Sequence, residues 1–88
     1  MKVEAYDTYF PTHRTGNLLD INVSTISEIL GFEPNVDDDP NKVVNSWAFI
    51  VGDEKCAVWD WKGSQEHGMF STYGPSEIFE KLFGTNYL

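Results

Sequence analysis

The sequence predicts an α+β domain in which a three- or four-stranded antiparallel sheet carries two short helices packed on one face. Three observations predict this class. Residues 47–62, WAFIVGDEKCAVWDWK, form two alternating apolar runs around a Gly-Asp pair, which is typical of a β-hairpin. Segments 22–30 and 75–83 repeat apolar residues at helical spacing. The chain has 88 residues, so these elements are expected to share one core in a single domain, residues 1–88.

The N-terminal part is expected to be one strand followed by a loop. Residues 2–9 alternate as a strand does, and Pro11 ends the run. Residues 12–17 are polar and contain a glycine, which predicts a loop.

The first helix has clear boundary signals. Thr25 and Glu28 fit a capping box, and Asn22 and Ser24 are alternative N-caps. Gly31 is placed to end the helix in the left-handed conformation.

The longest polar segment, residues 33–42, is expected to be a surface loop. It contains three consecutive acids, Asp37, Asp38 and Asp39. A calcium loop needs oxygen ligands at alternate positions, a glycine and a distant glutamate, and this segment lacks that register. The sequence therefore predicts no metal site here.

The hairpin has a predictable register. A two-residue turn at Gly52 and Asp53 pairs Val51 with Glu54, and Gly at its first position favours type II′. Alternation then puts apolar residues on both faces of the hairpin. One face carries Trp47, Phe49, Val51, Cys56 and Val58, and the other carries Ala48, Ile50, Ala57, Trp59 and Trp61. We expect the helices to cover the Trp47 face.

The remaining elements are a third strand and a closing helix. Residues 69–73 read as a strand antiparallel to the second hairpin strand. Pro75 suits the first position of the following helix, because its missing N–H is not needed there, and Gly84 ends that helix.

Two interpretations of the second hairpin face stay open. In the first interpretation, the N-terminal segment and the loops fold over Trp59 and Trp61, so that both faces become core. Alternatively, the two indoles stay exposed as an aromatic patch, which in a small domain marks a contact surface.

The charge balance limits the classes of partner. Six basic residues against fourteen acidic ones give a net charge of −8, which argues against direct nucleic-acid binding. Two explanations of this acidity are open. It keeps the protein soluble, or it forms a surface that docks on a basic protein. No stretch approaches the length of a membrane span, and the N-terminus does not resemble a signal peptide, so a cytoplasmic protein is expected.

No catalytic constellation is evident. His13 and His67 lie in loops, and neither belongs to a metal-binding or catalytic motif. The single cysteine, Cys56, occupies an apolar strand position and reads as a small buried hydrophobe. Asp60 reads as a sheet carboxylate paired with Lys62 or Arg14. We therefore expect no enzyme and no cofactor.

The chain resembles a loose set of small tailed-bacteriophage accessory proteins over residues 18–83. The resemblance lies in SWAFIV, a turn, CAVWDWKG, FSTYGP and a closing amphipathic helix, with EILGFEP at 28–34 before them. Such proteins often have a Trp where this chain has Phe70. The resemblance implies no catalytic residues. It implies a phage accessory protein, a class rich in inhibitors of host enzymes and defence systems.

These observations predict a non-enzymatic protein that binds and modulates a host protein in the host cytoplasm. Trp59 and Trp61 would be the apolar anchors, and the acids at 37–39 would steer association. One alternative is a nucleotide-binding protein that stacks bases on Trp59 or Tyr73. The other is a self-associating structural protein, for which a homodimer is the simplest form.

Overall fold

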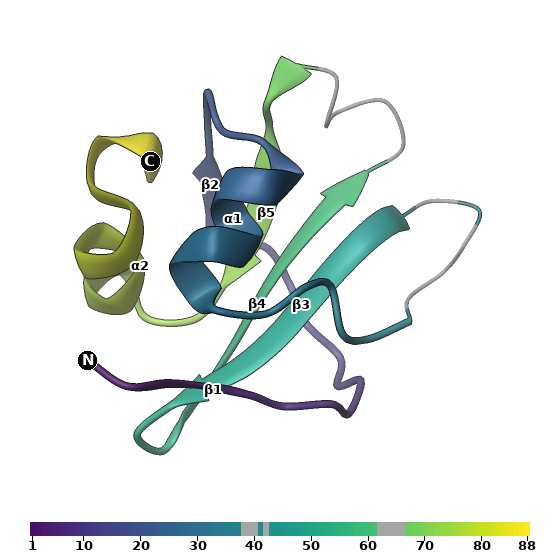
Figure 1. The fold of residues 1–88 in the computed structure, drawn as a ribbon, viewed down its shortest axis with the longest axis vertical. Coiled ribbons are helices and arrows are strands. Elements are labelled where there is room, and N and C mark those ends of the chain that lie inside the picture. Colours follow the sequence, from purple (N-terminus) through teal and green to yellow (C-terminus); the bar gives the residue numbers. More distant parts are fainter. Residues whose placement is uncertain (38–40, 42, 62–66) are drawn as a thin grey trace.

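The computed structural model describes residues 1–37, 41, 43–61 and 67–88. It is an α+β fold, as predicted, built on a five-stranded antiparallel sheet with the order β1-β3-β4-β5-β2 (Figure 1). In chain order the elements are β1 (Val3–Ala5), β2 (Gly16–Leu18), α1 (Val23–Leu30), β3 (Val43–Val51), β4 (Glu54–Trp61), β5 (Phe70–Tyr73), α2 (Ser76–Phe83) and the 3₁₀ turn η2 (Gly84–Asn86).

The central hairpin has the predicted register. Val51 pairs with Glu54, Phe49 with Cys56, and Trp47 with Val58. Gly52 has φ +61° while Asp53 does not have a positive φ, which is the type II′ pattern. The register therefore places Trp47 and Trp59 on opposite faces of the sheet, as the alternation predicts.

Helix α1 begins at Val23 because Asn22 caps it. The Asn22 side chain accepts a hydrogen bond of 2.8 Å from the Thr25 N–H. The predicted capping box at Thr25 and Glu28 is wrong, since Thr25 lies inside the first turn. Gly31 ends the helix at φ +94°, as expected.

Helix α2 departs slightly from its prediction at the N-terminus. Pro75 is the cap residue rather than the first helical residue, and Gly84 ends the helix. Neither helix in the described ranges has the length and apolar content needed to cross a lipid bilayer.

Both helices pack on the Trp47 face of the sheet, as predicted (Figure 1). Trp47 meets Phe70 edge-on at 6.0 Å between ring centroids, and Phe49 meets Phe79 of α2 in the same way. Apolar residues from both helices and four strands share this core: Leu18, Ile26, Leu30, Trp47, Phe49, Cys56, Val58, Phe70, Ile78, Phe79 and Phe83.

The predicted strand count is wrong because β2 lies in the segment expected to be a loop. Strand β2 has three residues, pairs with β5, and buries Leu18 completely. Its other side is bridged by Tyr87, and Asn17 exchanges two backbone hydrogen bonds with Leu88. A segment this short has no alternation to detect, so only its partners reveal it as a strand.

The strand order also fixes the path of the N-terminal segment. Strands β1 and β2 lie at opposite edges of the sheet, so the chain between them crosses its full width. The helices occupy one face, and residues 6–15 cross the other face (Figure 1). We call these residues the cross-over segment, and the face that they cross the far face.

Candidate binding surface

The far face holds a small second apolar cluster beneath the cross-over segment. Trp59 lies at its centre with Val43 and Ala57, and Phe10 and Tyr73 pack against them. Only 6 % of Trp59 is exposed. Its indole is therefore a packed side chain rather than an open surface.

Aromatic contacts hold the middle of the cross-over segment. The Phe10 ring meets Tyr73 at 6.0 Å and Tyr6 at 5.9 Å, both edge-on. The His13 ring also meets Tyr73 in a T-shaped contact, at 5.3 Å between ring centroids. The Lys55 ammonium lies 5.2 Å from the Tyr6 ring centre and 5.7 Å from that of Phe10, within cation–π range.

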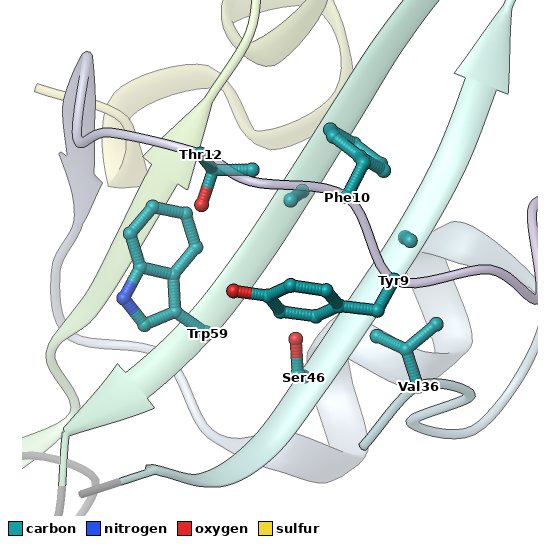
Figure 2. A pocket seen from close by; sticks show the side chains of 8 residues that line it. Tyr9, Phe10, Thr12, Val36, Ser46 and Trp59 are labelled. Atoms are coloured by element: carbon teal, nitrogen blue, oxygen red, sulfur yellow. The ribbon is translucent and has the colours of Figure 1, made fainter. Parts of the chain in front are cut away.

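A small hollow remains under the cross-over segment (Figure 2). The Tyr9 ring lies over Ser46 with its hydroxyl directed toward Trp59, and Thr12 lies above the indole. The cavity volume is about 10 Å³, which is close to the space of one water molecule. The cross-over segment thus leaves room beneath it for about one water molecule.

Trp61 is about half exposed, unlike Trp59. It is 48 % exposed, and Met69, near it on the far face, is 45 % exposed. The expectation of an exposed patch containing both indoles is therefore wrong for Trp59 and correct for Trp61. The physical reason is that the cross-over segment covers the middle of the far face and leaves its end open.

This open end forms a continuous surface around a shallow hollow of about 60 Å³. We call it the Trp61 patch and define it by the residues that line the hollow: Trp61, Met69, Arg14, Asn17, Phe70 and Ser71. It joins an apolar centre to a cation and to polar side chains. That composition is typical of a protein contact surface.

The other predicted binding residues are only partly placed. Asp37 is exposed and follows Val36, which lines the hollow under the cross-over segment, so the acidic loop begins beside the far face. Asp38 and Asp39 lie outside the described residues. Tyr73 is half-buried, and its ring makes T-shaped contacts with the rings of Phe10 and His13.

The backbone of β3 is covered along its outer edge. Strand β1 pairs with residues 49–51, and the Asn35 side chain bonds both the N–H and the C=O of Ala48 at 2.9 and 3.0 Å. The N–H groups of Asn35 and Val36 then donate to the Ser46 carbonyl. A partner that adds a strand at β3 would have to displace these groups, so the exposed side chains of the far face are the better candidate surface.

Asp60 has a structural role that the sequence did not predict, while Lys62, one of its two predicted ion-pair partners, lies outside the described residues. Val43 pairs with Trp61 and Ser46 with Trp59, so Val44 and Asn45 bulge opposite the single residue Asp60. The fully buried Asp60 carboxylate accepts hydrogen bonds from the Val44 N–H at 2.9 Å, the Asn45 N–H at 2.7 Å and the Asn45 side chain at 2.8 Å. It satisfies the N–H groups that the bulge removes from the strand ladder.

Comparison with protein-family models gives no match, and neither the curated proteins nor the solved structures contain a significant match to this chain. In the described part of the chain, no three His, Cys, Asp or Glu side chains gather in a way that could hold a metal ion.

Residue alternation alone did not identify Met69 and Arg14 as members of the surface. The register of β4 with β5 pairs Trp59 with Ser71, which places Met69 near Trp61 on the far face. The strand at 69–73 was predicted, but its pairing register was not. Arg14 reaches the patch only because the cross-over segment ends beside β2.

Cys56 is buried in the core as predicted, and burial, followed by the nearby Glu54 charge, raises the pKa of its thiol to about 12 from 9.0. We expect the native thiol to resist iodoacetamide at pH 8 and to react on unfolding in urea, because the folded state holds on the order of 10³-fold less thiolate. The unfolded thiol also loses its proton first, so stability should fall as the pH rises from about 9 toward 12. Rapid stoichiometric labelling of the native protein would contradict this.

Proposed function

We propose that this chain is a non-enzymatic binding protein that docks the Trp61 patch on a basic protein surface. The observation that carries the proposal is the exposure of Trp61 beside Met69 on a face where the neighbouring Trp59 is covered. Tryptophan is among the residues that contribute most to protein interfaces, because its large ring loses water on contact.

Charge supports a basic partner. The chain carries a net charge of −8, and Asp37 lies at the far-face end of the acidic loop. Such a field accelerates encounter with a cationic surface and makes association sensitive to salt. The resemblance to phage accessory proteins favours a host protein as that partner, whose activity the binding would modulate.

The buried position of Trp59 does not favour base stacking as the function. Trp59 is covered by the cross-over segment, and the Tyr73 ring already contacts the rings of Phe10 and His13. A nucleotide would have to displace these contacts before it could stack on either ring.

Replacing the two exposed apolar members of the patch, Trp61→Ser with Met69→Ser, tests the proposal. Both side chains are exposed, so the free energy of unfolding should change by less than about 1 kcal/mol. Affinity for a partner captured from a bacterial lysate should fall at least about 30-fold, the effect of losing one interface hot spot. The measurement is titration calorimetry with the purified partner at 50 and 300 mM NaCl, where the higher salt should weaken binding by the wild type.

Leu88→Ser is the matched control, because Leu88 is 75 % exposed and lies outside the patch. This variant should bind as the wild type does. Equal affinity of the double variant and the wild type for the same partner would contradict the proposal. So would a wild-type dimer that the double variant converts to a monomer in sedimentation, since the patch would then serve self-association.

A further inference from the structure

We propose that the covered part of the far face is a peptide-binding groove, and that the cross-over segment is its resident ligand. The groove consists of Ala48, Ala57, Trp59 and Tyr73. Its external ligand would be an extended peptide that contains an aromatic residue followed by proline. This groove is separate from the Trp61 patch, and the proposal does not depend on what the patch binds.

The segment that occupies the groove defines the chemistry of the ligand. Tyr9, Phe10 and Thr12 line the hollow above Trp59, with Pro11 between them (Figure 2). A residue before proline is restricted to extended backbone, and proline itself has a fixed φ. An aromatic–proline segment is therefore already extended and loses little entropy when it lies on an aromatic surface.

The segment is attached at its ends by backbone and in its middle by side chains. At one end the Tyr6 N–H donates to the Ala48 carbonyl at 2.9 Å, and at the other the Thr15 N–H donates to the Thr72 carbonyl at 2.8 Å. Between these ends, the rings of Phe10 and His13 meet Tyr73. An external peptide that carries the same side chains can replace these ring contacts.

The segment is also longer than the crossing requires. Strand order places four inter-strand spacings between β1 and β2, which is about 19 Å. The ten residues of the cross-over segment reach about 33 Å when extended. This slack lets the middle of the segment lift from the groove while β1 and β2 keep their pairing.

Lifting the segment would join the groove to the Trp61 patch. Trp59 and Trp61 lie two residues apart on the same strand and the same face. The exposed aromatic surface would then extend along β4 from one indole to the next. A peptide in the groove must compete with the tethered segment, whose effective concentration is on the order of millimolar.

The test uses the full chain and a synthetic peptide with the sequence of residues 6–14, YDTYFPTHR. Phe10→Ala weakens the resident ligand, so the peptide should bind this variant at least about tenfold more tightly than the wild type. The readout is the indole N–H resonances in an ¹⁵N correlation spectrum. The Trp59 resonance should shift on titration, while Trp47, which donates to Ser27 in the core, serves as the unshifted reference.

Two controls locate the binding. A peptide with alanine at the phenylalanine position should not shift Trp59. Adding Tyr73→Ser to Phe10→Ala should abolish the shift, because that variant removes one wall of the groove. Where Phe10→Ala does not give a dispersed spectrum, Phe10→Leu replaces it, since leucine keeps an apolar side chain at this position.

Each other outcome overturns the proposal. If millimolar peptide does not shift the Trp59 resonance of a folded Phe10 variant, the far face does not bind the peptide and there is no groove. If wild type and variant bind the peptide with equal affinity, the cross-over segment does not compete with it. A shift confined to the Trp61 indole would place the peptide on the patch instead. That result would leave the proposed function intact and reject the groove.

Discussion

Asp60→Ala is expected to destabilise the fold by at least about 3 kcal/mol, because the β3 bulge relies on this carboxylate as acceptor and hydrogen bonds to a charged group contribute about 1.5–3 kcal/mol each. The carboxylate accepts from the N–H groups of Val44 and Asn45 and from the Asn45 side chain. Alanine removes the acceptor of these donors and opens a gap beside the core. Urea unfolding, followed by far-UV circular dichroism, measures the loss.

Asp60→Asn is the matched control for this prediction. Asparagine keeps the volume and one acceptor oxygen, but it places an NH₂ group against the Asn45 amide. We expect Asp60→Asn to lower the free energy of unfolding, but by less than Asp60→Ala does. If alanine and wild type unfold at the same urea concentration, the carboxylate does not hold the bulge.

Gly74→Ala is expected to destabilise the fold by about 3 kcal/mol for two separate reasons. Gly74 has φ +131°, which side chains rarely adopt, and this strain contributes about 1 kcal/mol or more. A Cβ atom at this position would also lie 2.9 Å from the Cys56 sulfur and 3.2 Å from the Phe79 ring. Such overpacking of a core typically destabilises by a further 1–3 kcal/mol, so about 3 kcal/mol in total.

Gly52→Ala separates the two contributions. Gly52 also has a positive φ, but nothing lies within 4 Å of the position that a Cβ atom would take there, so only the strain contributes. The Gly52→Ala variant should therefore lose about 1 kcal/mol of its free energy of unfolding. Introducing Gly74→Ala into a Cys56→Ala background should recover part of the loss, because the sulfur is removed. Equal losses at the two glycines, or no coupling with Cys56, would contradict the packing argument.

The sequence alone predicted the elements whose signals are local. The Gly-Asp turn set the hairpin register, since a two-residue loop leaves one pairing, and Gly31 marked the end of α1. Alternation separated the Trp47 face from the Trp59 face because side chains in a strand have a period of two. Helices with one apolar stripe then had to cover one of those faces.

Strand β2 and the cap of α1 are two features that local sequence signals did not determine. Gly16–Leu18 is a strand because β5 and the residues around Tyr87 lie on either side of it. The structure also shows that Asn22, rather than Ser24 or Thr25, is the N-cap of α1. Neither fact is contained in the composition of the segment itself.

For the candidate site, the sequence determined that the hairpin has two apolar faces and that Trp59 and Trp61 share one of them. Only the tertiary structure decided that the first indole is covered and the second is open. The reason is the strand order: with β1 and β2 at opposite edges, the cross-over segment must cross the far face, and its path covers Trp59 but not Trp61. Pairing between distant segments sets that path, and no local pattern reports it.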